Sequence, residues 1–203
     1  MRYLTNLIIG LSLVGILAWN PAPLQILELK TFDWLMAQQE PVQDNMILLV
    51  DLDEEIVQAY GGYPLPRSLY ATLIEKTQGT AGVTVLMPDP DIRGAGQDAQ
   101  LAQALLRNPA VLAYTASNQA TQVGPHVGTA QLGGDPQEWL YQYPGILRSA
   151  LESQGVGLIS TNPELDGVVR RLPLAISVEN RIYPSFALEM LRLGTGDPSY
   201  QIK

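Results

Sequence analysis

The apolar positions of this chain fall into two patterns, short continuous runs and stripes with helical spacing. Four runs, at residues 47–50, 83–87, 110–115 and 156–161, contain no charged residue. A run of four to six residues without alternating polar positions is typical of a strand buried on both faces, as in a parallel sheet covered by helices. The four runs therefore predict the central strands of one sheet.

Segments with helical spacing separate these runs. Leu69 and Leu73 lie four residues apart on one side of a helix that is predicted to begin near Arg67. A second helix follows the run at 83–87, and Asp98 is predicted to be its N-cap, because a short carboxylate side chain can accept the first free backbone N–H groups. Further predicted strands, at 110–115 and 156–161, follow this helix along the chain.

The last third of the chain mixes turns with shorter elements. Residues 139–151 predict a broken helix, and residues 168–178 predict a strand whose Pro173 suits a sheet edge. Ser185 is predicted to cap a final helix, which Gly194 closes. The order of elements predicts an α/β fold: a largely parallel sheet sandwiched by helices, with an antiparallel edge hairpin, preceded by one N-terminal transmembrane helix.

Residues 3–20 form the membrane-type segment of the sequence, and two interpretations of it stay open. It is either a retained transmembrane helix or a cleaved signal peptide. We expect retention, because cleavage after Ala22 would place Asn20 where a cleavage site needs a small residue. Arg2 precedes the segment and no other Lys or Arg occurs before Lys30, so the N-terminus is expected in the cytoplasm and the main domain outside.

The predicted organisation has four parts, which are a transmembrane anchor, a juxtamembrane helix, an extracytoplasmic domain and a tail, at residues 1–22, 23–40, 41–196 and 197–203. Residues 24–40 within the second part carry apolar residues roughly on one face of a helix. This helix either covers one side of the sheet or carries motion to the bilayer, and the two roles are compatible.

Composition and charge narrow the classes of function. A chain of 203 residues with 46% apolar residues can bury a substantial core. The formal net charge of −8 argues against a nucleic-acid partner, because phosphate binding needs clustered Lys and Arg. The sequence contains no cysteine, which excludes disulfide and thiolate chemistry.

Pairs of aspartates follow the first two predicted strands: Asp51 and Asp53, and then Asp89 and Asp91. The carboxyl ends of neighbouring parallel strands meet at one edge of a sheet, where α/β folds gather ligands. Clustered carboxylates need compensation by protonation, by arginine or by a cation, and oxygen ligands favour Ca²⁺ or Mg²⁺. The alternative, which stays open, is that they cap turns and pair with arginine. In that case Asp51 or Asp53 would anchor Arg67 at the start of its helix.

Three further motifs are weaker. Residues 94–99 match the dinucleotide fingerprint G-x-G-x-x-A, but they do not follow directly on the strand, and nearby aspartates would repel a pyrophosphate. Asp51-x-Asp53 also occurs in phosphatases with an aspartyl nucleophile, but the hydroxyl residue and the lysine of those enzymes have no counterpart here. His126 is the single histidine, within a polar loop predicted over 116–137, so a zinc site or a catalytic triad is poorly supported.

Several motifs occur together in an order that is similar to a known family. They are LLVDLDEE, GGYPLPRSLYATLI, MPD, DAQLAQAL, ELDGVVRRLPL and YPSFALEML. In this combination the chain resembles the type-two CHASE domain over residues 30 to 194. Tyr63 and Leu65 replace the two tryptophans of that family's W-P-W-P-R turn. The family's late D-G-x-x-R-R signature is matched by Asp166, Gly167, Arg170 and Arg171.

The resemblance implies an extracytoplasmic sensor of the kind found in bacterial adenylate cyclases, histidine kinases and serine/threonine kinases, which is not itself an enzyme. It also implies that further membrane segments and a cytoplasmic output domain follow. The expected partners are the membrane and an unknown small ligand or protein, and a homodimer stays open. The alternatives are a hydrolase or metal-dependent enzyme that uses the acidic cluster, and a purely structural membrane-proximal domain. The candidate ligand-binding residues are Asp51, Asp53, Arg67, Asp89, Asp91, Asp166 and Arg170.

Overall fold

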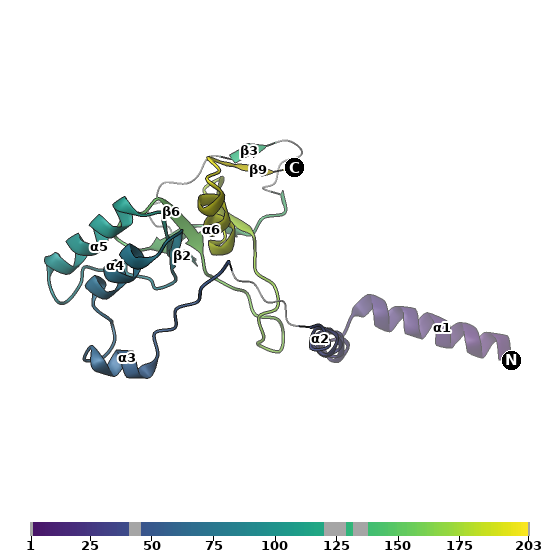
Figure 1. Cartoon of the computed structure of the whole chain (residues 1–203). Coiled ribbons are helices and arrows are strands. Elements are labelled where there is room, and N and C mark those ends of the chain that lie inside the picture. Colours follow the sequence, from purple (N-terminus) through teal and green to yellow (C-terminus); the bar gives the residue numbers. More distant parts are fainter. Residues whose placement is uncertain (1, 41–45, 120–128, 132–137, 203) are drawn as a thin grey trace. The chain divides into compact units, whose positions relative to one another are not determined.

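A computed structural model of the chain describes residues 2–40, 46–119, 129–131 and 138–202 (Figure 1). His126 and most of the polar loop predicted at 116–137 lie outside the described residues. The chain divides into two compact units, each described here by itself. Unit 1 comprises Met1–Asp51 and Pro163–Arg170, and unit 2 comprises Leu52–Asn162 and Arg171–Lys203. Helices and sheets occur together, so the predicted α/β class is confirmed.

Unit 1 contains two helices, α1 (Arg2–Trp19) and α2 (Ala22–Met36). Asn20, with a φ of +44°, makes the break between them, and its carbonyl accepts a hydrogen bond of 2.6 Å from the Gln25 side chain. Pro23 in the first turn of α2 costs no hydrogen bond, because the N–H groups there have no partner within the helix. The juxtamembrane helix predicted at 24–40 therefore starts two residues earlier and ends at Met36.

Helix α1 forms where the sequence predicts a transmembrane helix, at residues 3–20. Within the parts of the chain that the structure describes, no helix is both long and apolar enough to cross a membrane.

The central sheet of unit 2 is built around β2 (Ala110–Ser117). Strands β1 (Ala81–Val83) and β6 (Gly155–Leu158) pair with β2 in parallel, and β5 (Gly145–Arg148) pairs with it in antiparallel. The first half of β2 pairs with β6 and the second half with β5, so one long strand organises all four. The predicted strands at 110–115 and 156–161 are confirmed at these positions, with slightly different ends.

Two smaller sheets complete the described strands. β7 (Ala175–Val178) and β8 (Arg181–Pro184) form an antiparallel hairpin, and β4 (Gln142–Tyr143) pairs with β7 in parallel. The two-residue hairpin turn, Glu179 and Asn180, has positive φ at both positions, which suits the right-handed twist of the strands. β3 (Thr129–Gln131) pairs in parallel with β9 (Tyr200–Ile202). The predicted antiparallel hairpin is confirmed, but it starts at Ala175 and not at residue 168.

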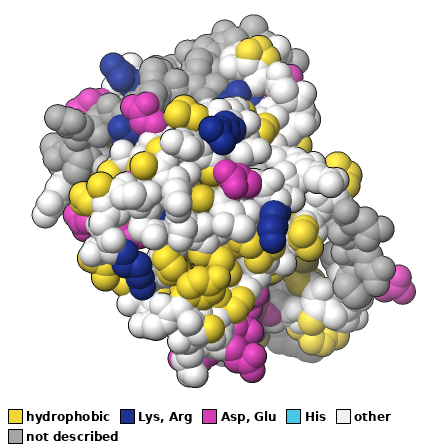
Figure 2. Space-filling view, turned by 60° about the vertical axis from the view of Figure 1, so that its left-hand side comes forward, with side chains coloured by type: hydrophobic (Ala, Val, Ile, Leu, Met, Phe, Trp, Pro, Cys, Tyr) yellow, Lys and Arg dark blue, Asp and Glu magenta, His cyan; other side chains and the backbone are white. Residues whose placement is uncertain are grey.

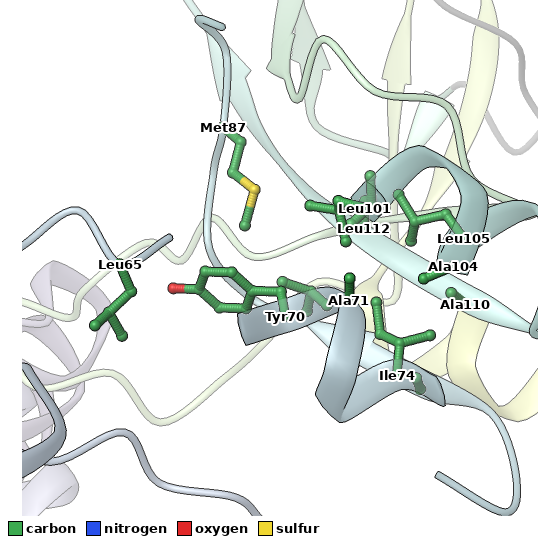
Figure 3. Close-up of a cluster of buried hydrophobic side chains, with 12 residues drawn as sticks. Leu65, Tyr70, Ala71, Ile74, Met87, Leu101, Ala104, Leu105, Ala110 and Leu112 are labelled. Atoms are coloured by element: carbon green, nitrogen blue, oxygen red, sulfur yellow. The ribbon is translucent and has the colours of Figure 1, made fainter. Parts of the chain in front are cut away.

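A core cluster joins helices α4 (Arg67–Lys76) and α5 (Ala95–Arg107) to the sheet. Figure 3 shows the side chains of Ala71 and Ile74 on α4 turned towards α5 and the neighbouring strand. The predicted apolar stripe of α4 is only partly confirmed, because Leu69 packs against the cluster while Leu73 is not among its members. Its other labelled members in the figure are Leu65, Tyr70, Met87, Leu101, Ala104, Leu105, Ala110 and Leu112.

Helix α6 (Phe186–Thr195) packs closely against β6, and glycines in the strand make this contact feasible. A Cβ atom added at Gly157 would lie 2.3 Å from the Cα of Phe186, a backbone atom that cannot move aside. A Cβ at Gly155 would lie 2.5 Å from a carboxylate oxygen of Glu189. Ser185 caps the helix as predicted, since its hydroxyl accepts a hydrogen bond from the backbone N–H of Leu188 (3.2 Å).

Two predicted strands are wrong. Residues 47–50 form no strand, and their side chains are exposed, Leu48 by 88%. A continuous apolar run marks a segment that would gain from burial, but it does not specify the backbone partner that a strand requires. The strand predicted at 83–87 ends at Val83. Beyond it the backbone turns to Ser149 and Ala150, which bond to the N–H and the carbonyl of Met87.

Three helix predictions also need correction. Residues 139–151 form β4 and β5 in place of a broken helix, because pairing with β7 and β2 overrides the weak local helical signal. Asp98 does not cap α5, whose N-cap is Gly94. Helix α6 continues through Gly194 to Thr195, and its C-cap is Gly196, which adopts the left-handed conformation with a φ of +75°.

Candidate functional site

The late turn of unit 1 brings two charged residues of the D-G-x-x-R-R motif together. Gly167 has a φ of +79°, which glycine adopts without strain, and its N–H bonds to the carbonyl of Glu164. The Asp166 carboxylate accepts a hydrogen bond of 3.2 Å from the backbone N–H of Val168. The turn therefore fixes the Asp166 side chain next to that of Arg170, four residues on.

Arg170 binds two aspartates at once. Its Nε and Nη2 donate to the two carboxylate oxygens of Asp33 on α2, at 2.7 and 2.8 Å. Its Nη1 and Nη2 donate to the two oxygens of Asp166, both at 2.8 Å. Paired hydrogen bonds between a guanidinium and a carboxylate are the strongest and most directional ion pairs that side chains make. Arg170 therefore ties α2 to a turn 137 residues further along the chain.

Lys30 completes the group, which we call the Arg170 clasp: Lys30, Asp33, Asp166 and Arg170. The Lys30 amino group lies 3.4 Å from an Asp166 oxygen and 3.9 Å from an Asp33 oxygen. Two cations thus balance two carboxylates. The side chains differ in exposure, from 5% for Arg170 and 12% for Asp166 to 59% for Lys30, so the clasp has a covered centre and an open rim.

The electrostatics of the clasp favour the charged forms. Hydrogen bonding to Arg170 holds the pKa of Asp166 far below its usual value of 3.8, and it also lowers the pKa of Asp33. The hydrogen bonds to Asp33 and Asp166 raise the pKa of Arg170 further. A general acid or base works best with a pKa near the ambient pH, and these shifts all lead away from neutrality. The arrangement suits positioning and binding better than proton transfer.

Unit 2 has an arginine centre of its own, formed by Arg67, Asp89, Asp91 and Asp98 and called here the Arg67 centre. The Arg67 guanidinium donates to a carboxylate oxygen of Asp98 and to the backbone carbonyl of Asp89. The backbone N–H of Arg67, at the start of α4, donates to the Asp91 carboxylate at 3.2 Å. Asp98 also accepts from the backbone N–H of Asp91, at 3.2 and 3.3 Å. These bonds join the start of α4 to the loop before α5.

The predicted anchoring of Arg67 by a carboxylate is thus present, but with different partners. Neither Asp51 nor Asp53 provides it. Asp53 caps the short helix α3 (Glu54–Ala59) by accepting a hydrogen bond of 3.0 Å from the N–H of Ile56. Asp51 is exposed. Asp98 was predicted to cap a helix. It is instead the carboxylate that pairs with the Arg67 guanidinium, which is the role predicted for Asp51 or Asp53.

The four strand-end aspartates are not gathered into one site. Asp89 contributes its backbone carbonyl, while its residue is exposed; Asp91 bonds the start of α4. Over the described stretches of the chain, no three His, Cys, Asp or Glu side chains come together in a way that could hold a metal ion. The prediction depended on pairing between the first two predicted strands, and the first of these strands does not form.

A buried network around Glu189 was missed by sequence reasoning. Glu189 is fully buried, accepts two hydrogen bonds of 2.9 Å from Arg192, and accepts the phenolic O–H of Tyr200 on β9. Glu189 raises the pKa of Arg192, and burial together with Glu189 raises that of Tyr200. The available signal was the spacing of Glu189 and Arg192, one turn apart on α6. Lys30 and Asp33 were missed too, although they are two of the three charged residues of α2.

Figure 2 shows the distribution of charged side chains on one face of the molecule. On the face shown in Figure 2, the Lys and Arg side chains lie apart from one another, among apolar and acidic side chains. This face therefore offers no basic patch of the kind that phosphate binding requires.

These features define the class of protein: a mixed α/β domain in which two arginines with little exposed side-chain surface hold distant segments together. The sequence model of the CHASE2 domain matches residues 8–202, nearly the whole chain, so the chain belongs to the CHASE2 domain family. CHASE2 domains are extracytoplasmic sensory domains, and the suspected type-two CHASE resemblance is confirmed. No curated protein and no solved structure matches the chain.

Proposed function

We propose that this chain is the extracytoplasmic sensory domain of a membrane-bound signal-transduction protein, and that the Arg170 clasp is the contact through which binding changes the state of α2. The clasp carries the proposal. It joins the helix after the apolar N-terminal segment to the D-G-x-x-R-R turn of the domain. The ligand or partner itself stays unassigned.

The clasp has the properties of a contact with two states. Helix α2 has no buried residue, so little apolar packing opposes its release once the ion pairs break. An element held mainly by a few polar contacts opens at a lower free-energy cost than the global core. Binding that favours either the closed or the open clasp would then shift the population of α2 positions.

The hydrolase alternative finds less support in the geometry. It requires carboxylates gathered at the sheet edge, whereas those of the Arg67 centre bind arginine and backbone groups. A structural role remains the competing hypothesis, and a signalling readout separates the two.

The test joins residues 1–203 to the catalytic domain of a reporter adenylate cyclase through an added transmembrane helix, which returns the chain to the cytoplasm. We expect Arg170→Ala to change the basal cyclase rate several-fold, because it releases α2. Arg107→Ala, at an exposed position of α5, serves as the matched control and should leave the rate unchanged. An unchanged rate for Arg170→Ala, in a variant whose α2 is shown by hydrogen exchange to be released, would favour the structural role.

The proposed location has its own test. Residues 24–203 outside the cytoplasm should be digested when protease is added to intact spheroplasts. Digestion that requires permeabilised cells would contradict both the location and the orientation predicted from Arg2 and Lys30.

A further inference from the structure

The guanidinium of Arg170 has two edges, and each edge holds one carboxylate. The Nη1–Nη2 edge binds Asp166, which lies four residues earlier in the same turn and also accepts a hydrogen bond from the N–H of Val168. The Nε–Nη2 edge binds Asp33, which belongs to α2. Each edge presents two N–H groups that match the two oxygens of one carboxylate. The turn therefore supplies one carboxylate locally, and a separate element supplies the other.

The two carboxylates are not held equally firmly. The side chain of Asp166 is 12% exposed, whereas that of Asp33 is 41% exposed. Among the described residues, the Asp33 carboxylate is bonded by Arg170 alone, with the Lys30 amino group further away at 3.9 Å. Helix α2 has no buried residue, so little apolar packing fixes Asp33 in its place. Asp33 is thus the carboxylate that a dissolved competitor can replace.

The charges of the Arg170 clasp select the competitor. With Asp33 displaced, the two cations Arg170 and Lys30 face a single carboxylate, Asp166, so one negative charge is missing. A carboxylate restores the balance and fits the Nε–Nη2 edge, whereas a doubly charged sulfate would leave an excess of one negative charge.

We propose that the Nε–Nη2 edge of Arg170 is a binding site for a small organic carboxylate, which takes the place of Asp33. Helix α2 then keeps only the exposed contact between Lys30 and Asp166, so binding loosens it. The assignment of this ligand class rests on the proposed function, in which the Arg170 clasp is the contact that binding changes.

The competition between Asp33 and a free carboxylate sets the expected affinities. The Arg170 side chain is 5% exposed while Asp33 is in place, so a competitor binds the molecules in which Asp33 has moved away. The apparent affinity is reduced in proportion to that fraction, and minor states of this kind are populated at about 0.1–10%. Removing the Asp33 carboxylate should therefore raise the apparent affinity for a free carboxylate by about tenfold or more.

Acetate is the probe, because it corresponds to the side chain of aspartate as a free molecule. The Nε–H resonance of Arg170 is followed by NMR in the isotope-labelled full chain, and Arg170→Lys assigns it by its loss. In Asp33→Ala, added acetate should shift this resonance back towards its wild-type position. Half of that shift should need about tenfold less acetate, or less still, than half of the acceleration of α2 hydrogen exchange in the wild type.

Glu28→Ala is the matched control, because it removes the same charge from another exposed position of α2. It should keep both the wild-type Arg170 resonance and the wild-type response to acetate. Potassium chloride at the same ionic strength and neutral acetamide should each act several-fold more weakly than acetate, which separates binding from screening. Sulfate should also act several-fold more weakly.

Three results would overturn the proposal: an Arg170 resonance in Asp33→Ala that acetate does not move, equal acetate responses in Asp33→Ala and Glu28→Ala, or sulfate binding as tight as that of acetate. None of these would affect the proposed function, provided that Arg170→Ala still changes the rate of the joined cyclase. Failure of the proposed function would be a different result, in which acetate loosens α2 in the wild type while the cyclase rate of Arg170→Ala is unchanged.

Discussion

Arg67 and Arg170 make similar ion pairs in different surroundings. Arg67 is 6% exposed and is close in sequence to residues of the apolar core, among them Leu65 and Tyr70. The Arg170 side chain is 5% exposed, but neither α2 nor the turn at 163–170 contains a buried residue. The Arg67 centre is thus added to a segment that apolar packing already holds. The Arg170 clasp is itself the main attachment in its unit.

The comparison between the Arg67 centre and the Arg170 clasp shows that similar ion pairs can affect stability differently when they are lost. Removing one partner of a buried pair leaves the other charge without compensation, so the loss is felt by the whole cooperative unit when the pair is embedded in its core. Where apolar packing is absent, the same loss opens only the element that the pair attached. We therefore expect global destabilisation from changes at Arg67 and local opening from changes at Arg170.

The largest effect is expected for Arg67→Ala. This change leaves Asp98 and the Asp89 carbonyl without their main donor, and it should lower the free energy of unfolding by about 3–5 kcal/mol. Urea denaturation of the full chain measures it. Arg107→Ala, an exposed arginine near the end of α5, should change the free energy of unfolding by no more than about 0.5 kcal/mol. Similar denaturation midpoints for the two variants would contradict the expectation that changes at Arg67 destabilise the fold globally.

Arg170→Ala should act locally. We expect amide hydrogen exchange in α2 to accelerate by roughly tenfold or more, while the amides of α4 and β2 exchange as in the wild type. Exchange is carried out on the intact chain, and mass spectrometry of the peptides obtained by digestion afterwards resolves these segments. Arg170→Lys should restore only part of the protection, because an ammonium group cannot make the two paired contacts. Uniform acceleration across both units would mean that the Arg170 clasp supports the global fold after all.

The pH dependence of the Arg170 clasp follows from its lowered carboxyl pKa values. A group whose pKa is depressed in the folded state contributes stability above its unfolded value, here about 3.8, and loses it as the pH falls towards the folded value. Protection of α2 should therefore be constant between about pH 5 and 9, and decrease only below about pH 4. Asp33→Asn should remove part of this acid sensitivity. A transition near neutral pH would contradict the assignment.

The smallest effect is expected for Lys30→Ala. Its side chain is 59% exposed, and its amino group lies 3.4 and 3.9 Å from the carboxylates, so water and salt screen the attraction. Exchange of the α2 amides should change by less than about twofold. Raising the salt concentration to 0.5 M should remove what difference there is, while the contrast between Arg170→Ala and the wild type persists. A large effect of Lys30→Ala would show that the rim of the clasp matters as much as its centre.

The sequence predicted those parts of the fold in which a local pattern and its partner coincide. The helix at Arg67 and the strand at 110–115 were found because apolar periodicity there matches real burial. Residues 47–50 carry an equally clear pattern, but the structure gives them no strand partner. The tendency of an apolar run to become buried can be recognised from the run itself. Strand pairing depends on a second segment, so it cannot be predicted from the run alone.

The candidate site shows the same limit. Asp166 and Arg170 were singled out from their motif, but their partner Asp33 was not, because 137 residues separate it from Arg170 and no local spacing connects them. Arg67 was expected to need a carboxylate, since a cation at a helix start opposes the helix dipole by about 0.3–1 kcal/mol. The need was predictable from the residue and its position. That Asp98 is the carboxylate that pairs with Arg67 could be seen only in the folded structure.

The long separation within the Arg170 clasp also sets an order of events during synthesis. At about 5–20 residues per second, a ribosome adds the 137 residues between Asp33 and Arg170 in roughly 7–27 s. Throughout that interval α2 lacks its ion-pair partner, while the segments of the unit 2 core are being made. The clasp can form only after Arg170 has been added, and by then the strands of the central sheet of unit 2 have already been made.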